Sequence, residues 1–322
     1  MRAVRFDEFG DYDVLKVVDV PEPAAQAGEL LVRMRAAAVN SFDNSARRGA
    51  IPQVTPPATP GNEGVGVVVA GDGVPIGTRV MLAGPFGFGR PGTWQEYVVA
   101  APSEAIPVPG TLSDVEAAAV PVAYQAAQLA LVCGCALMPG MSLLIPGVGG
   151  SVANAAIQLA RAQGARRVIT SAGRTDKAER AAELGYADVI DLSRESLSDG
   201  VRRLTDGTGV DVALDTIGGP ITGEALASVG RNGLVVVMGY AGGTAPTIDV
   251  MHLIWKPARI VGFNGMFQPP EAFAEAWSVI LRLLTDGEVK PLIDRMYPLE
   301  QAAEASRHLA EDRPLGKVVL TM

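Results

Sequence analysis

Residues 142–165, SLLIPGVGGSVANAAIQLARAQGA, constrain the fold of this chain more than any other segment. A short apolar run leads into a glycine-rich turn, and the turn leads into a stretch with helical spacing. That spacing would bury Ala156, Leu159 and Ala160 on one helix face, because they stand at i, i+3 and i+4. The segment therefore predicts a buried strand, a tight turn and a helix.

A turn of this kind can bind an anion. Glycine lets the backbone come close to a pyrophosphate, whose charge then meets the free amides and the positive end of the following helix. We expect the phosphate contacts at Gly149, Gly150, Ser151 and Val152. Tight strand-to-helix turns also need glycine for steric reasons, so the setting of the turn decides between the two interpretations.

That setting is an alternation of strands and helices. Apolar runs recur as SLLIP, RRVIT, DVALD, LVVVMG and ARIVGF, separated by segments with helical spacing. This pattern predicts an α/β domain with a doubly wound parallel sheet over residues 123–291. Residues 1–122 carry short apolar runs cut by Gly and Pro, which is typical of a strand-rich domain. Residues 292–322 read as strand, helix and strand, and the last strand could pair with either domain.

The end of the second strand indicates which dinucleotide binds. NAD sites place an acidic residue about 20 positions after the glycines, whereas NADP sites avoid that charge and supply a cation. Here Ser171 stands 21 residues after Gly150, no acid ends the strand, and Arg174 and Lys177 follow. We expect NADPH, bound through Ser171, Arg174 and Lys177. The alternative is that both cations are ordinary solvated charges at a helix start.

Further cofactor contacts are expected where later strands end. Gly239 and Tyr240 follow LVVVM, and Phe263 and Asn264 follow ARIVG. Ligands of open α/β sheets bind at the carboxyl ends of the strands, so these four residues are candidates for the cofactor side of the site.

With these residues in view, the chain resembles the quinone oxidoreductase branch of the medium-chain dehydrogenase/reductase superfamily over nearly its full length. The segments that carry the resemblance are AAAVNSFDNSARRG, TPGNEGVGVVVAGDGV, GVDVALDTIGG and PLGKVVL. The resemblance implies a Rossmann domain inserted in a GroES-like β-rich domain, formed by 1–122 and completed by 292–322. It also implies a cleft between the domains for nicotinamide and substrate, and a homodimer formed through the edges of the Rossmann sheets.

The chain departs from the zinc-dependent relatives at their metal ligands. Those relatives would have Cys at Asn40, His at Asn62 and four cysteines near residues 85–105, whereas the cysteines of this chain are Cys133 and Cys135. Carboxamides are poor zinc ligands. We expect no metal site, and without a Lewis acid we do not expect ordinary alcohol dehydrogenation.

Two polar side chains are candidates for catalysis. The amide of Asn40 could donate a hydrogen bond to a carbonyl oxygen that gains charge during hydride transfer. Tyr124 could line the pocket or supply a proton. The plain alternatives are a structural Asn in a turn and a tyrosine that only lines the pocket. Asp43 and Glu63 are expected to hold loops.

Charge and composition narrow the partners. With 27 basic and 35 acidic residues, a net charge of −8 and no long basic run, the chain shows no footprint for nucleic acid or an anionic membrane. We expect a cytoplasmic NADPH-dependent reductase acting on a small quinone or conjugated enone. An enoyl thioester reductase is a second hypothesis, with Arg47, Arg48 and Arg90 as a phosphate patch. A non-catalytic NADPH-binding redox sensor is a third.

Overall fold

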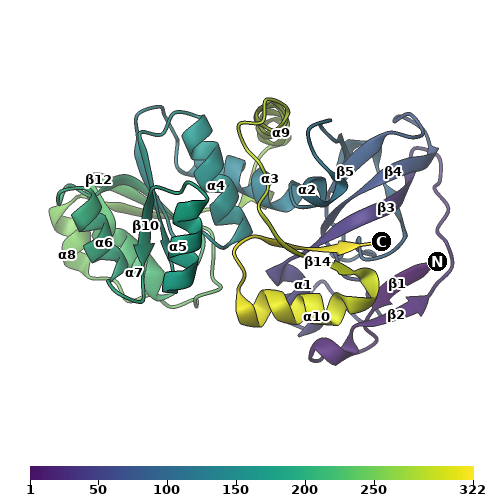
Figure 1. Ribbon diagram of the computed structural model, residues 1–322. Coiled ribbons are helices and arrows are strands. Elements are labelled where there is room, and N and C mark those ends of the chain that lie inside the picture. The colour runs from purple at the N-terminus through teal and green to yellow at the C-terminus, as the bar shows by residue number, and fades with distance from the viewer. The chain divides into compact units, whose positions relative to one another are not determined.

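The computed structural model describes all 322 residues and separates into two compact units. Unit 1 contains residues 1–122 and 290–322, and unit 2 contains residues 123–289. Figure 1 shows the elements of both units, which are described separately here. No helix has the length and apolar character that crossing a bilayer requires.

Unit 2 is built on a six-stranded sheet with the strand order β10-β9-β8-β11-β12-β13. Its strands are β8 (Ser142–Ile145), β9 (Arg167–Ala172), β10 (Asp188–Asp191), β11 (Val210–Asp215), β12 (Val229–Val237) and β13 (Arg259–Gly262). Its α-helices are α3 (Pro121–Leu129, which begins in unit 1), α4 (Ser151–Ala162), α5 (Thr175–Glu183), α6 (Leu197–Leu204), α7 (Pro220–Ser228), α8 (Val250–Trp255) and α9 (Pro270–Thr285).

All neighbouring strands of this sheet are parallel. The chain runs outward from β8 through β9 to β10, returns to β11 beside β8, and then runs outward on the other side to β13. The doubly wound parallel sheet is therefore confirmed. Five strands were expected, and the sixth, β10, was missed because Asp188 and Asp191 leave it only two apolar residues.

The core of unit 2 follows the helical spacing in the sequence. Ala156, Leu159 and Ala160 of α4 are fully buried, as expected from their positions. Helices α6 and α7 pack on each other, and their apolar side chains form one core cluster with Leu144, Ile169 and other residues of the sheet.

Unit 1 contains a seven-stranded sheet and a separate pair of strands, β1 and β2. The strands are β1 (Arg2–Arg5), β2 (Lys16–Asp19), β3 (Leu30–Val39), β4 (Glu63–Gly71), β5 (Arg79–Ala83), β6 (Tyr97–Ala100), β7 (Ala105–Pro107), β14 (Ile293–Pro298) and β15 (Lys317–Thr321). The α-helices are α1 (Ser41–Arg47), α2 (Asp114–Ala118) and α10 (Ala302–Arg307).

The C-terminal strand β15 lies inside the sheet of unit 1. It is antiparallel to β3, with Leu320 opposite Ala37, and parallel to β14. The sequence left the partner of this strand open, and the structure assigns it to the strand-rich unit. Val318, Leu320 and Trp94 are buried in a common core. The pairing brings Lys317, the first residue of β15, beside the end of β3, where Asn40 stands.

Candidate functional site

The glycine turn after β8 has the geometry of an anion site. Gly147 has φ +83, and a Cβ there would lie 2.9 Å from Cδ1 of Ile217. The amide of Gly150 bonds to the carbonyl of Gly147 at 2.9 Å, and the next amide to bond back is that of Asn154, to the carbonyl of Gly150 at 2.8 Å. The amides of Ser151 and Val152 therefore lie in the first turn of α4, where no helical carbonyl precedes them. The residues fit the pyrophosphate of a dinucleotide, because a 12-residue helix adds its positive end to these donors.

Ser171 is hydrogen-bonded to this turn. The residue is fully buried, its Oγ accepts a hydrogen bond from the amide of Gly147 at 3.2 Å, and its carbonyl accepts one from Val148 at 2.9 Å. The side-chain oxygen of Ser171 is therefore used inside the protein in this structure, and its contact with the cofactor stays a prediction. Counting residues from the glycines located the strand correctly but not the direction of the side chain.

Arg174 and Lys177 follow β9 as expected, and Arg174 already has an anionic partner. Its guanidinium makes two hydrogen bonds to the carboxylate of Asp176, at 3.0 and 2.6 Å. Both side chains are exposed, and this contact lowers the pKa of Asp176. Lys177 is half-buried in the first turn of α5. A phosphate bound by Arg174 would have to compete with Asp176.

A loop after β11 belongs to the same edge of the sheet. The buried carboxylate of Asp215 accepts hydrogen bonds from the amides of Ile217 and Gly218 and from the hydroxyl of Thr222, at 2.9, 2.8 and 2.6 Å. Three donors on one carboxylate fix the path of the loop. Sequence reasoning noted the segment GVDVALDTIGG but assigned no role to Asp215. An acid followed by small residues at the end of a strand was the available signal.

The ends of β12 and β13 complete this edge. Gly239 packs so closely on the β11 loop that a Cβ would lie 1.9 Å from the carbonyl oxygen of Thr216. Tyr240 is exposed, and the amide of Phe263 bonds to the carbonyl of Val237 at 2.9 Å. Asn264 is exposed and its Oδ1 accepts a hydrogen bond from the amide of Met266 at 2.9 Å, which caps a short 3₁₀ helix. The structure thus brings these four residues to the carboxyl edge of the sheet, the edge that also carries the glycine turn.

In unit 1, Asn40 is the centre of a buried polar cluster. Its Nδ2 donates to Oδ1 of Asn62 at 2.6 Å and to Oε1 of Glu63 at 2.8 Å, and its Oδ1 accepts from the ammonium of Lys317. Both amide hydrogens and the amide oxygen therefore have partners inside the protein. This geometry favours the structural alternative for Asn40, because it leaves no amide hydrogen for a substrate oxygen, and its part in catalysis stays a prediction.

A buried ion pair holds the cluster together. Lys317 Nζ lies 2.6 Å from Oε1 of Glu63, and the two side chains are 3% and 0% exposed. The other Glu63 oxygen accepts from the amide of Val122 at 2.7 Å. Glu63 therefore ties β4 to both β15 and the start of α3, which agrees with the loop-holding role expected from the sequence.

Asp43 is a second buried carboxyl beside this cluster. Its oxygens accept hydrogen bonds from the amides of Asn40 and Gly61, at 2.8 and 2.9 Å. Burial raises its pKa to about 7, although both amides and the nearby Lys317 oppose that shift. Asp43 thus holds the start of α1 against the segment that leads into β4.

Tyr124 does not have the surroundings of a proton donor. The residue is only 2% exposed and belongs to α3. Burial, with a smaller contribution from Tyr186, raises the pKa of its phenol. Gln158 is near enough to oppose that shift slightly, yet the hydroxyl makes no hydrogen bond of ordinary geometry. In this structure the phenol is enclosed within the protein, and a role of Tyr124 in catalysis or in lining the pocket stays a prediction.

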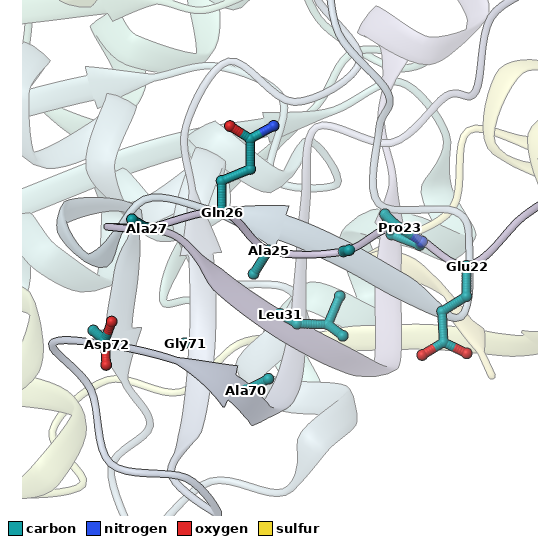
Figure 2. A pocket seen from close by; sticks show the side chains of 10 residues that line it. Glu22, Pro23, Ala25, Gln26, Ala27, Leu31, Ala70, Gly71 and Asp72 are labelled. Carbon is teal, nitrogen blue, oxygen red and sulfur yellow. The ribbon is translucent and has the colours of Figure 1, made fainter.

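A surface groove of unit 1 lies away from these residues. The groove, of about 640 Å³, runs between the segment 22–27 and the end of β4, and Figure 2 shows Glu22 and Asp72 at its two ends. The other lining residues are Pro23, Ala24, Ala25, Gln26, Ala27, Leu31, Ala70 and Gly71. The groove contains none of the residues discussed above.

No three His, Cys, Asp or Glu side chains of the chain lie close enough together to hold a metal ion.

Comparison with known proteins agrees with this architecture. Residues 26–110 match the alcohol dehydrogenase GroES-like domain, and residues 151–282 match the family described as zinc-binding dehydrogenase. The human synaptic vesicle membrane protein VAT-1 homolog is 31% identical, over 99% of this chain and 86% of that protein. Rat quinone oxidoreductase is 29% identical over 100% and 98% of the two chains. A solved structure described as an NAD-dependent alcohol dehydrogenase has a TM-score of 0.90 and 31% identity, with both chains fully covered.

These findings define the class of protein. The fold and its nucleotide-binding edge are those of an oxidoreductase that uses a nicotinamide cofactor. The chain belongs to the medium-chain dehydrogenase/reductase superfamily, in its quinone oxidoreductase branch.

Proposed function

We propose that this protein transfers hydride from NADPH to a quinone or a conjugated enone, without a metal ion. The observation that carries the proposal is the cluster of Asn40, Asn62, Glu63 and Lys317. Asn40 and Asn62 stand at positions where the resemblance places ligands of the zinc-dependent relatives. Two carboxamides are poor zinc ligands, and the remaining carboxylate is already neutralised by an ammonium. Chemistry that needs no Lewis acid suits this donor set.

A conjugated acceptor matches what these residues supply. When bound, the reduced nicotinamide supplies two electrons and one hydrogen as hydride. The acceptor carbon takes the hydride, its π-system carries the negative charge to the carbonyl oxygen, and a proton from solvent completes the reduction. The net reaction consumes NADPH, a proton and the acceptor, and yields NADP⁺ and the hydroquinone or saturated ketone. The protein has to orient the reactants and donate hydrogen bonds to the oxygen.

The preference for NADPH is supported by the end of β9. The strand ends at Ala172 and Gly173 follows, so no carboxylate stands where NAD sites place one. Arg174 and Lys177 come next, and a phosphate with two negative charges is a stronger partner for Arg174 than the single charge of exposed Asp176.

The two competing hypotheses have less support. Two of the three arginines expected to bind a carrier phosphate are already engaged, whereas Arg48 is exposed. Arg47 is buried, with its guanidinium 4.0 Å from the centre of the Tyr12 ring, and Arg90 pairs with Glu104. A redox sensor would bind the cofactor without consuming it, which a turnover assay detects.

We also propose that the partner of this chain is a second copy of itself, bound at β13. This strand ends the sheet and leaves one side unpaired, and the nearby α8 exposes Val250, Ile254 and Trp255. The opposite edge, β10, carries two like charges, Asp188 and Asp191, whereas β13 carries one charge, Arg259, beside Ile260 and Val261. Like charges on an edge strand discourage pairing. Two copies related by a twofold axis would pair β13 with itself and cover the apolar side chains.

The test of this function is an acceptor panel. Oxidation of NADPH and NADH is followed with 1,4-benzoquinone, a cyclic enone and the matching saturated ketone. The proposal predicts turnover of the first two with NADPH and little with the third. Tight NADPH binding without turnover of any acceptor would favour the sensor, and efficient reduction of the saturated ketone would contradict a reaction limited to conjugated acceptors.

A further inference from the structure

The buried cluster of unit 1 fixes the direction of the Asn62 side chain. Lys317 is an ammonium, which can only donate, so the atom of Asn40 that faces it must be the oxygen Oδ1. The Nδ2 of Asn40 then faces Asn62 and donates at 2.6 Å. The atom of Asn62 that receives this bond must in turn be its oxygen. No ambiguity between amide oxygen and nitrogen is left at either residue.

The nitrogen Nδ2 of Asn62 lies at the other end of this amide. It is turned away from the cluster and makes no hydrogen bond within the protein, and Asn62 is half-buried whereas Asn40 and Glu63 are buried. Asn62 therefore presents two N–H groups at the surface of unit 1. The cluster holds them in a fixed direction.

The arrangement also suits a donor to developing negative charge. Lys317 and Glu63 balance each other's charge, so the ion pair itself leaves no net negative charge behind the amide. The ammonium of Lys317 donates to Asn40, and Asn40 donates to Asn62, so each group polarises the next one in the chain. Donors held in place before the reaction need no reorganisation when charge develops, which is why they accelerate it.

We propose that Asn62 is the residue that donates a hydrogen bond to the acceptor's carbonyl oxygen during reduction, with Asn40 and Lys317 as positioning residues. This inference rests on the proposed function. It replaces Asn40, whose hydrogens are used internally, with the neighbour that Asn40 orients. The specificity that follows is for acceptors whose oxygen becomes anionic.

Two substitutions of Asn62 separate this role from a structural one. Asn62→Asp keeps the oxygen that accepts from Asn40, removes the outward donor and adds a negative charge. Asn62→Leu keeps the volume and removes both functions. If Asn62 only satisfies Asn40, the Asp variant stays active. If it is the donor, kcat with NADPH and 1,4-benzoquinone falls about 100-fold or more in both variants. Gln26→Glu, on an exposed amide of the same unit, is the control for the charge change.

The positioning residues need a readout that a purely structural role would not move. Lys317→Met, assayed where hydrogen exchange shows that unit 1 is still folded, should lower kcat and leave the Kd for NADPH within about twofold, and Lys317→Arg should restore part of kcat because it returns the cation. If the Kd for NADPH rises as kcat falls, or if Lys317→Arg does not restore kcat, the positioning role is overturned.

Binding of 4-nitrophenolate, a stable oxyanion, tests the donor without turnover. Its absorbance shift is titrated with the cofactor-loaded protein. We expect weaker binding by about tenfold in Asn62→Leu and by more in Asn62→Asp. If the wild type reduces no acceptor but binds the phenolate through Asn62, the proposed reaction fails and the donor stands. If the wild type reduces quinone and Asn62→Asp keeps turnover and phenolate affinity within about threefold, the reaction stands and the inference about Asn62 is overturned.

Discussion

Removal of the Lys317 ammonium should destabilise unit 1 strongly. In Lys317→Met, the carboxylate of Glu63 would remain fully buried without its cation, which now lies 2.6 Å away. Loss of one partner of such a pair costs about 3–5 kcal/mol, because the remaining charge is neither solvated nor neutralised. Lys317 and Glu63 also stand on different strands, so their separation weakens the contact between β15 and β4.

Two further variants show whether the charge is the cause. Glu63→Gln combined with Lys317→Met removes both charges and keeps an amide oxygen as an acceptor for the amide of Val122. The double variant should recover most of the loss, to within about 1.5 kcal/mol of the wild type, because neutral replacements of buried ion pairs are often tolerated. Lys290→Met removes a lysine that pairs with Glu116 at 2.7 Å but is 68% exposed. This control should cost no more than about 1 kcal/mol.

Hydrogen exchange followed by mass spectrometry measures these effects within unit 1. Amides of β3 and β15 report the free energy of opening of that unit, whatever unit 2 does. Lys317→Met should speed their exchange by about 100-fold or more, since each 1.4 kcal/mol is a factor of ten. A loss below about 1 kcal/mol, or a double variant as unstable as Lys317→Met, would refute the reasoning.

Three other predictions follow from single contacts. Arg174→Ala should weaken NADPH binding about tenfold and leave the affinity for NADH within about twofold. Asp176→Asn should tighten NADPH binding by up to about fivefold, because it frees Arg174. Calorimetric titration of both cofactors measures these affinities, and equal affinities in the wild type would contradict the preference for NADPH. Burial raises the pKa of Asp43 to about 7, so between pH ~4 and 7 the folded protein keeps a proton that the unfolded chain has lost. The free energy of unfolding should therefore fall as pH rises from about 4 to 7, by on the order of 4 kcal/mol. Asp43→Asn should flatten this slope in urea unfolding, and an unchanged slope would assign it to other groups. Val261→Lys on the β13 edge should yield monomers in light scattering, whereas Ile76→Lys on unit 1 should not change the mass, and a wild-type monomer would refute the proposed dimer.

The sequence predicted most of the fold because its signals were local. The apolar runs for five of the six strands of unit 2 and the helix face of Ala156, Leu159 and Ala160 could be read from spacing alone. β10 could not, because a short edge strand with an acid at each end lacks an apolar run. The partner of β15 was also beyond the sequence, since strand pairing depends on residues that are distant along the chain.

The candidate site was predicted less completely, because the direction of a side chain is not a local property. Ser171 was placed on the correct strand, yet its hydroxyl points beneath the glycine turn. Asn40 was singled out as a donor, and only the arrival of Lys317 from the other end of the chain shows that its hydrogens face inward. Asn62 was noted only as a missing zinc ligand. Its position as the outward amide follows from three hydrogen bonds that join β3, β4 and β15.

The most direct test of the proposed reaction is the fate of a label in a single turnover. NADPH carrying deuterium at C4 of the nicotinamide is mixed with the protein and a cyclic enone, and the product is analysed by mass spectrometry and NMR. Direct hydride transfer predicts that the deuterium from one face of C4 appears at the β-carbon of the saturated ketone, while the α-carbon takes a proton from solvent. Reduced product without deuterium at the β-carbon, or deuterium at the carbonyl carbon of an allylic alcohol, would contradict the account.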